Sequence, residues 1–325
     1  MAEVSVLIPN YNHAHFLKER IDSVLRQTYQ DFELIILDDC STDNSKDIIE
    51  GYRSDLHVTT IVYNKVNSGS PFKQWQKGIS LANGKYIWIA ESDDWCEPTL
   101  LEELVNGVKE NDGVVISYCG SVVISDRGEI LYTSENKRFS EVKDGTAFVE
   151  SHLLENNQIF NASMAIFNKA SFNGISLEFT RYKFCGDWLF WIMLAQKGRV
   201  HISGKLLNYF RKHQADVSGR SVQDGTYFLE YSSIVKYLVE HHLINEQLYY
   251  SLLFKKYKEL KDFEFSDSAR KELSATYLKL IGTKNMTKFK SAEKRSHLHD
   301  LYIKIWIITP GFIKNTIRKI VPAKK

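Results

Sequence analysis

The chain has 325 residues, 43% of them hydrophobic and 25% charged, so it can bury a large core and does not have the composition of a disordered protein. No apolar run approaches the roughly 20 residues needed to span a bilayer, which argues against an integral membrane protein. The net charge of +2 is unevenly spread, because residues 284–325 carry eleven Lys/Arg and two Asp/Glu, a balance of +9. Residues 1–283 therefore carry −7, and the tail is expected to prefer anionic surfaces.

The cysteines indicate a reducing compartment. The four of them lie far apart, form no CxxC pair and follow no signal peptide: Cys40, Cys96, Cys119 and Cys185. This pattern favours reduced thiols in a cytoplasmic protein over a disulfide framework or a zinc site.

Apolar strand-like runs alternate with amphipathic helical runs through the first half of the chain. The predicted strands are Val4–Ile8 (stopped by Pro9), Phe32–Leu37, Thr59–Tyr63, Tyr86–Ala90 and Val114–Tyr118. The predicted helices are Leu17–Gln27, Ser45–Tyr52, Phe72–Leu81 and a run from Pro98 to about Lys109. This alternation predicts an α/β fold with a mostly parallel sheet that is covered by helices on both faces.

The second half of the chain is less regular at first and then helical. Asp126-Arg127-Gly128 predicts a hairpin turn between Val122–Ile124 and Ile130–Tyr132, and Trp188–Gln196 reads as a helix. From Tyr227 onward the pattern is almost wholly helical. We therefore expect a catalytic domain over residues 1–225 and a helical region over 226–325.

The predicted strand Tyr86–Ala90 is followed at once by three acids: Glu91, Asp93 and Asp94. Open α/β sheets bind ligands at the carboxyl ends of their strands. Carboxylates packed this closely repel one another unless a cation or hydrogen-bond donors compensate them, and oxygen ligands suit Mg²⁺ or Mn²⁺. The alternative is an acidic loop exposed to solvent.

Polar groups also follow the other predicted strands: Tyr11-Asn12, Asp38-Asp39 and Asn67-Ser68-Gly69. The ends of parallel strands converge on one edge, so a single crevice suited to a nucleotide collects these groups. Neither GxxxxGK[ST] nor a GxGxxG after the first strand is present. Phosphate charge would then be met by a metal and by later basic residues, which favours a nucleotide-sugar over a hydride carrier or ATP.

Four segments, in this order, resemble glycosyltransferase family 2: Val4–Asn12, Leu34–Asp43, Asn67–Gly69 and Tyr86–Asp94. The resemblance covers about residues 3–215. It implies the GT-A fold (Rossmann-like) and an inverting transfer of a sugar from a nucleotide donor, most often a UDP-sugar, with Mn²⁺ or Mg²⁺ as cofactor. The implied acceptor is a saccharide, lipid-linked in many relatives, in the synthesis of capsule, O-antigen or related surface polysaccharide. Nucleic acid is not an expected partner.

The resemblance also implies which residues bind the donor. Asp39, with Asp38 and Asp43 nearby, takes the place that holds base and ribose, although Asp43 is equally well read as a helix N-cap. The family's DxD metal motif matches Glu91-Ser92-Asp93, where Glu replaces the first Asp, so Asp93 is the expected metal ligand. The full expected donor-binding set is Pro9, Tyr11, Asp38, Asp39, Asn67, Gly69, Lys73, Glu91, Asp93 and Arg211.

Two later segments complete the implied site. Phe184–Phe190 resembles the family's acidic motif before a hydrophobic helix and implies that Asp187 is the catalytic base, although Asp187 alone could cap that helix. Relatives often have Glu-Asp where this chain has Gly186-Asp187. Tyr209–His213 resembles an element that folds over the diphosphate, which implies Arg211 as a phosphate ligand and His213 as a metal ligand.

Other side chains near these segments have open readings. Lys73 is either a phosphate ligand or a solvated lysine. His13 and His15 are read as ordinary residues of the first loop.

The basic tail mixes aromatic and aliphatic residues with lysines over Leu301–Val321, interrupted by Pro310-Gly311. This composition predicts two short helices and peripheral contact with a membrane through residues 300–325, at the cytoplasmic face of the inner membrane. The alternative is a helix packed on the body of the protein.

Two other functions compete with sugar transfer. A nucleotidyltransferase should carry a Gly-rich basic loop after the first strand, which Pro9–Asn12 is not. A binding module without turnover should lack a site acid or histidine, whereas Asp93, Asp187 and His213 are all present.

Overall fold

The computed structural model describes residues 2–134, 139–213 and 223–308, with the backbone alone described over 292–308. The chain divides into two compact units, residues 1–234 and 235–325. This division falls within helix α9 (Thr226–Glu240), so the first turns of that helix belong to the sheet-containing unit. The expected functional boundary near residue 225 stays a prediction.

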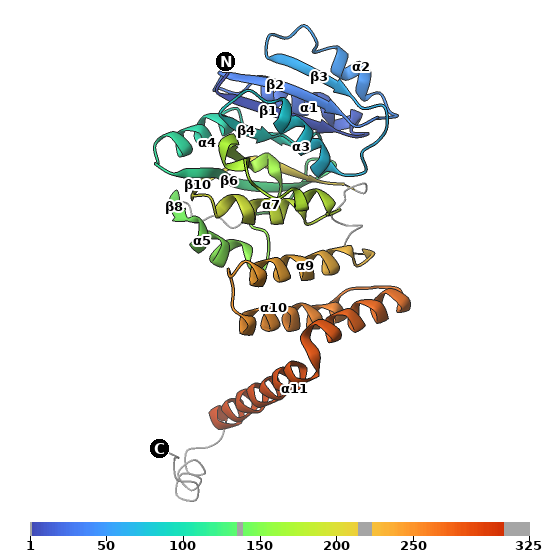
Figure 1. The fold of residues 1–325 in the computed structure, drawn as a ribbon, viewed down its shortest axis with the longest axis vertical. Coiled ribbons are helices and arrows are strands. Elements are labelled where there is room, and N and C mark those ends of the chain that lie inside the picture. The colour runs from blue at the N-terminus through green and yellow to red at the C-terminus, as the bar shows by residue number, and fades with distance from the viewer. Residues whose placement is uncertain (1, 135–138, 214–222, 309–325) are drawn as a thin grey trace, which may run out of the picture. The chain divides into compact units, whose positions relative to one another are not determined.

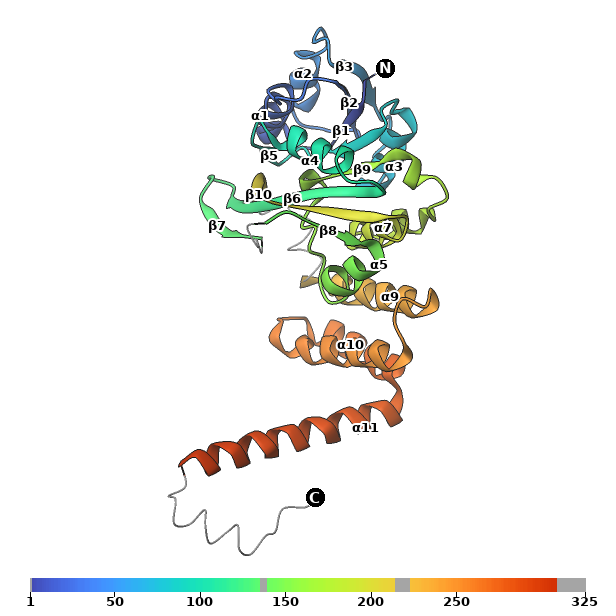
Figure 2. The same ribbon diagram turned by 90° about the vertical axis from the view of Figure 1, so that its left-hand side faces the viewer.

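The first unit is built on one sheet with the strand order β3-β2-β1-β4-β9-β6-β10-β5, to which β7 adds beside β6 and β8 beside β10 (Figures 1 and 2). The strand bounds are β1 Val4–Asn10, β2 Phe32–Asp38, β3 Val58–Tyr63, β4 Tyr86–Ile89, β5 Trp95–Cys96, β6 Val114–Ser125, β7 Ile130–Thr133, β8 Glu141–Asp144, β9 Ala165–Asn168 and β10 Arg199–Lys212.

Six strands of this sheet run in one direction. β3, β2, β1 and β4 pair in parallel, and β6 pairs in parallel with β10. Between these two groups lies β9, which is antiparallel to both β4 and β6. The expected α/β fold with a mostly parallel sheet is therefore confirmed, and the expected hairpin is present as β6 and β7.

Two strand predictions were wrong in their bounds. Val114–Tyr118 and Val122–Ile124, predicted as separate strands, form the single strand β6, and the first strand was predicted too short. The first strand does not stop at Pro9 but continues through it to Asn10, with Pro9 in register with Leu37 of β2. Proline is tolerated here because pairing with β4 on the other side ends at Leu7, so the missing N–H removes no hydrogen bond from that ladder.

Helices cover both faces of the sheet (Figures 1 and 2). α1 and α4 share one face, where Thr28, just after α1, donates a hydrogen bond to Glu102 of α4. α3 and α7 share the other face, where Trp75 of α3 contacts Phe190 of α7. The bounds in the first unit are α1 Ala14–Leu25, α2 Ser45–Glu50, α3 Pro71–Leu81, α4 Leu100–Lys109, α5 Gly145–Phe148, α6 Lys169–Phe172 and α7 Gly186–Ala195. Short 3-10 or π turns occupy Val149–Leu153, Ala162–Met164 and Leu177–Arg181.

Helix α7 lies in the core. Every one of its residues except Asp187 is buried, and its Phe190 and Trp191 contact Phe167 of β9. The predicted helix over Trp188–Gln196 is confirmed, with its start two residues earlier. Asp187 is the single acid of this apolar helix and lies at its N-terminal end. A charged side chain in such a position is expected to be functional.

The second unit is helical, as expected. It contains the end of α9, α10 (Glu246–Glu259), a 3-10 turn over Leu260–Asp262 and α11 (Asp267–Ile308), which is broken at Gly282 by a left-handed backbone (φ 74°). Phe254 of α10 stacks on Phe289 of α11 at 5.0 Å. No helix among the described residues is long and apolar enough to cross a membrane. The predicted break at Pro310-Gly311 lies outside the described residues.

Candidate active site

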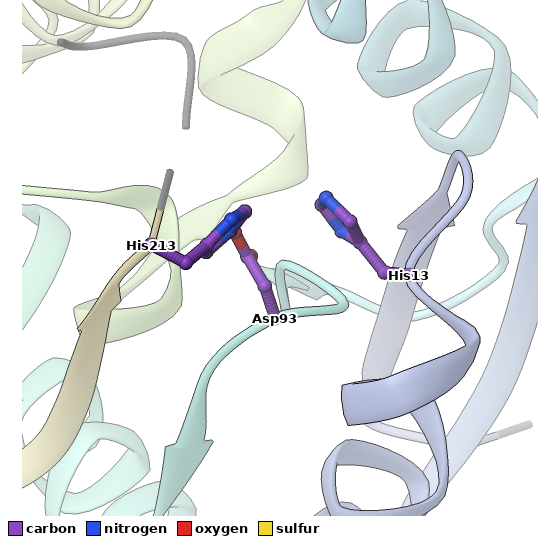
Figure 3. Close-up of side chains that lie close together, drawn as sticks. All are labelled: His13, Asp93 and His213. Atoms are coloured by element: carbon purple, nitrogen blue, oxygen red, sulfur yellow. The ribbon is translucent and has the colours of Figure 1, made fainter. Parts of the chain in front are cut away.

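His13, Asp93 and His213 meet at the carboxyl edge of the sheet (Figure 3). They follow β1, β4 and β10, three strands that run in the same direction, and their side chains point toward one another. One ligand atom from each residue lies within 4.8 Å of the other two, and Nε2 of His213 lies 3.0 Å from Oδ2 of Asp93. This spacing suits a single divalent cation.

Asp94 holds the loop that carries Asp93 in place. The Asp94 carboxylate is buried and accepts hydrogen bonds from the Ser163 hydroxyl (2.6 Å), the Asn161 amide and the backbone N–H of Arg211 (3.0 Å). These donors come from both sides of the loop, so Asp94 anchors the loop and Asp93 is presented at the edge.

The three acids of the loop differ in charge state. Burial, reinforced by Asp93 and Asp94, raises the pKa of Glu91 to about 8, and burial beside Asp93 also raises the pKa of Asp94. Burial acts on Asp93 too, but the hydrogen bond from His213 and the charges of His13 and His213 bring the pKa of Asp93 below its usual value. Asp93 therefore has the lowest pKa of the three acids and is the one most readily ionised.

His13 completes the cluster, although sequence reasoning took it for an ordinary loop residue. Its Nδ1 lies 2.8 Å from the Ser92 hydroxyl, which leaves Nε2 as the nitrogen available to a metal. Its ring meets that of His213 edge-on at 5.5 Å. A histidine within the first loop was the available signal, but no spacing rule connects it with residue 213.

Arg211, expected on the phosphates, is engaged with the acidic loop. Its Nε donates to the carbonyl of Asp93 (2.9 Å), its Nη2 to Glu19 (2.6 Å), and its guanidinium lies 4.7 Å from the ring centre of Phe16. With these contacts Arg211 fixes the loop that presents Asp93. A role as phosphate ligand stays a prediction.

Asp39 lies at the same edge, but its carboxylate is saturated by the protein. It accepts from the side chains of Asn64 (2.5 Å) and Gln74 (2.7 Å) and from both the N–H and the hydroxyl of Ser68. Asp38 likewise accepts from the Asn10 amide and the Ser41 N–H. Both acids hold the loops of the expected nucleotide pocket in place, and their direct contact with a base or ribose stays a prediction.

The loop after β3 contains the segment Asn67-Ser68-Gly69, as the sequence predicted. The Asn67 amide donates to the Asp39 carbonyl and its oxygen accepts from Gly69, which has a left-handed backbone (φ 72°) that favours glycine. Lys73, at the start of α3, donates to the Ser68 carbonyl. These residues form one hydrogen-bonded turn beside Asp39.

Three further expected residues lie around this edge. Tyr11 is exposed in the loop after β1, Pro9 is buried within β1, and Glu91 accepts from Trp75 Nε1 at 2.8 Å. Asp43 is not the N-cap of α2, which is Asn44, but it lies one residue earlier and accepts from the N–H groups of Ser45 and Ala14. None of these contacts tests a role in donor binding.

Asp187 lies at the start of α7 and connects to the acidic loop through residues 157–161. Its Oδ2 accepts from Asn157 (3.0 Å), and Asn161 donates to Asp94. Because an extended chain rises by at most about 3.6 Å per residue, the Cα atoms of Asn157 and Asn161 lie within about 14 Å of each other. Burial raises the pKa of Asp187 to about 7, although the Trp188 N–H and Asn157 oppose the shift. A carboxylate with this pKa is matched to proton transfer near neutral pH.

Gly186 has no room for the glutamate that relatives often carry. A Cβ at this position would lie 2.5 Å from the Phe179 carbonyl oxygen and 2.5 Å from Cε2 of Phe72. The departure from the family pattern is thus fixed by packing at the entry to α7, and Asp187 is the acid of this segment.

Comparisons with known proteins show the family and the fold of the chain. The model of the family described as "Glycosyl transferase family 2" matches residues 5–175. The chain is 36% identical over 113 residues to glycosyltransferase GlyG of Streptococcus pneumoniae, a match that covers 35% of this chain and 37% of GlyG. It thus spans little more than a third of that relative's length.

Two solved structures share the fold. The crystal structure of Staphylococcus aureus TarS 1–349 in complex with UDP-GlcNAc has a TM-score of 0.54 at 19% identity and covers 85% of this chain and 71% of that one. TarS is described as a poly(ribitol-phosphate) beta-N-acetylglucosaminyltransferase, and its matched sequence, 30% identical over 118 residues, covers 36% of this chain and 20% of TarS. The mannosyltransferase PcManGT of Pyrobaculum calidifontis, in complex with GDP-Man and Mn²⁺, has a TM-score of 0.51 at 13% identity and covers 99% and 88% of the two chains.

Proposed function

The chain belongs to glycosyl transferase family 2, and we propose that it transfers a sugar from a UDP-sugar to the saccharide acceptor of a cell-surface glycan with inversion at the anomeric carbon. The single observation that carries the proposal is the convergence of His13, Asp93 and His213 on the edge to which residues 157–161 also connect Asp187.

The donor assignment rests on the polar edge and on the related structures. TarS has been solved with UDP-GlcNAc and PcManGT with GDP-Man, so nucleotide-sugars occupy this fold in both. In this chain the loops around Asp38, Asp39 and Asn67 are fixed by internal hydrogen bonds, which is expected of a preorganised pocket. We assign the nucleotide to these loops.

The metal would be held by His13, Asp93 and His213. Two imidazoles and one carboxylate suit Mn²⁺ better than Mg²⁺, which prefers an all-oxygen shell. A divalent cation, when bound, offsets the negative charge that develops on the leaving diphosphate. Arg211 and Asp94 keep the Asp93 loop in place for this task.

Asp187 acts as the general base in this proposal. Its carboxylate takes the proton of an acceptor hydroxyl while that oxygen forms a bond to the anomeric carbon, and the bond between that carbon and the diphosphate oxygen breaks. The nucleoside diphosphate leaves with the bonding electron pair. A base on the face opposite the leaving group makes this a single displacement, which inverts the configuration.

The acceptor and the location are proposed more broadly. TarS is described as acting on poly(ribitol-phosphate), so a polymer of the cell surface is the class of acceptor that we favour. We also propose that the basic tail brings the enzyme to the cytoplasmic face of a membrane, where a lipid-linked acceptor would lie. Residues 309–325 of that tail lie outside the described part of the chain.

The proposal is tested by turnover of UDP-sugars. The full chain is incubated with UDP-GlcNAc, UDP-glucose and UDP-galactose in turn, with Mn²⁺ or with EDTA, and released UDP is measured. We expect Mn²⁺-dependent release that Asp187→Asn reduces at least about 100-fold while UDP still binds. Asp126→Asn, an exposed acid of the β6–β7 turn, is the control and should retain full activity. UDP binding with no turnover of any donor would favour the non-enzymatic binding module.

A further inference from the structure

A carboxylate from helix α9 holds the backbone that leads into α7. Oε1 of Glu230 accepts from the N–H of Lys183 (2.6 Å), and its Oε2 accepts from the N–H groups of Phe184 (2.9 Å) and Cys185 (2.7 Å). We propose that Glu230 is the positioning residue of the segment that presents Asp187. This inference rests on the proposed function, because it assumes that Asp187 is the catalytic base.

The start of α7 depends on this contact. The N-cap position, Cys185, offers no side-chain hydrogen bond to the helix, and the first N–H groups of a helix have no partners within it. A carboxylate at a helix N-terminus is also favoured by the helix dipole. Glu230 supplies this anion from α9. It binds the backbone N–H groups of residues 183–185, the last of which lies two positions before Asp187, so α9 sets the direction in which α7 begins.

Helix α9 is itself anchored at this point. Phe228 and Tyr231 on either side of Glu230 are buried, and Tyr231 contacts Trp188 at 5.7 Å between ring centres. Tyr227 contacts Phe184 at 5.9 Å. The three hydrogen bonds therefore join two helices that also pack against each other, which fixes the position of the segment that carries Asp187.

The charge of Glu230 also acts on Asp187. Asn157, the backbone N–H groups of Asp187 and Trp188, and Glu230 all influence the pKa of Asp187, and of these groups Glu230 carries the negative charge. Together with burial, which has the larger effect, it raises the pKa of Asp187. Removal of the charge should therefore shift the pH dependence of the reaction toward lower pH.

A glutamine at position 230 cannot reproduce the contact. Both carboxylate oxygens accept N–H groups, so the amide NH₂ of glutamine must face at least one backbone N–H, donor against donor. Glu230→Asp keeps the charge but shortens the arm. The two variants therefore separate the effect of the charge from that of the hydrogen bonds.

The contact is tested without reference to activity by hydrogen–deuterium exchange of the full chain, followed by mass spectrometry of peptides that cover residues 183–188. We expect both Glu230→Gln and Glu230→Asp to exchange at least about tenfold faster there. The matched control is Glu240→Gln, which removes an exposed acid from the same helix, and its exchange at 183–188 should equal that of the parent protein. Unchanged exchange in Glu230→Gln overturns the inference.

The catalytic consequence is tested with the UDP-sugar that is turned over. Glu230→Gln should lower kcat about 10- to 100-fold with little change in KM for the donor, and should move the acidic midpoint of the kcat profile to lower pH. Glu230→Asp should lower kcat with a smaller movement of the midpoint. If Asp187→Asn abolishes turnover while Glu230→Gln leaves kcat and the midpoint unchanged, the positioning role is wrong. If Asp187→Asn retains turnover, the proposed base is wrong, and the exchange experiment alone then decides whether Glu230 holds the segment.

Discussion

Nε2 of His213 lies 3.0 Å from Oδ2 of Asp93, although 120 positions separate the two residues in the sequence. Strand β10 brings His213 to the end of β4, and His13 approaches from the end of β1. Each residue of this cluster thus follows a different strand, and the three meet only when those strands have assembled into one sheet.

The cluster predicts how Mn²⁺ affinity responds to mutation. Loss of either imidazole, in His13→Ala or His213→Ala, should weaken Mn²⁺ binding to the full chain about 10- to 100-fold, as measured by calorimetry with MnCl₂. His15→Ala, two residues later at the start of α1 and outside the cluster, is the control and should bind as the parent protein does. Equal affinities in all three variants would place the metal elsewhere.

The raised pKa of Asp187 predicts an acidic limb in the rate profile. Because a general base must be ionised, and burial brings its pKa to about 7, kcat at saturating Mn²⁺ should rise about tenfold per pH unit below pH 7 and level off above it. The measurement is initial UDP release between pH 5 and pH 9. A rate that falls as pH rises from 5 to 7 would contradict the assignment of Asp187 as base.

Asn161 should be costly to remove. Its buried amide donates to Asp94 and its oxygen accepts from Asn208, so Asn161→Ala leaves both partners short of a hydrogen bond. We expect a loss of about 1–3 kcal/mol in the free energy of unfolding by urea. Asn106→Ala, at an exposed position of α4, should change stability by less than about 0.5 kcal/mol.

Gly186→Ala should disturb the entry to α7. The new methyl group would lie 2.5 Å from the Phe179 carbonyl, which the backbone cannot avoid without a shift, so we expect a loss of about 1–3 kcal/mol and a lower kcat. Gly51→Ala is the control, because Gly51 is the C-cap of α2 with a right-handed helical backbone, and a Cβ there would lie 3.2 Å from the nearest atom, the Ile48 carbonyl oxygen. Unfolding followed by circular dichroism compares the two, and equal stability would show that α7 can yield at this point.

The basic tail predicts a change in fractionation. A chain that lacks residues 300–325 should move from the membrane fraction to the supernatant of a cell lysate, because the attraction of the lysines to anionic lipid is lost. UDP binding of the shortened chain, measured in parallel, should be unchanged. Equal distribution of both chains would leave the tail without a role at the membrane.

The sequence was sufficient for the fold and for the order of the site segments. Asp93 and His213 were recognisable because each stands at the end of a predicted or family-like segment, and parallel strands bring such ends to one edge. Strand β9, by contrast, has four residues within an irregular region, and a run that short carries no periodicity. Its place between β4 and β6 is a property of the assembled sheet.

The hydrogen-bond partners of individual side chains could not be predicted from the sequence, because they too depend on the assembled fold. The resemblance implied a phosphate ligand for Arg211, but the contacts of Arg211 with the Asp93 carbonyl, Glu19 and Phe16 could not be predicted from the sequence. Asp39 has the expected position, but the four donor groups from residues 64–74 that bind its carboxylate were not visible in its motif. Glu230 lies in a helix that sequence reasoning assigned to a separate region, and no local pattern connects it with residues 183–185.

Because β9 runs antiparallel to β4 and β6, it brings a different set of side chains to the carboxyl edge of the sheet. A parallel strand delivers the residues that follow it to the carboxyl edge, whereas an antiparallel neighbour delivers the residues that precede it. The approach to β9 therefore arrives beside the end of β4, where the Ser163 hydroxyl receives the Glu91 N–H at 3.0 Å. One inverted strand thus brings an additional loop to this edge of the sheet, and through Asn161 and Ser163 that loop holds Asp94 in place.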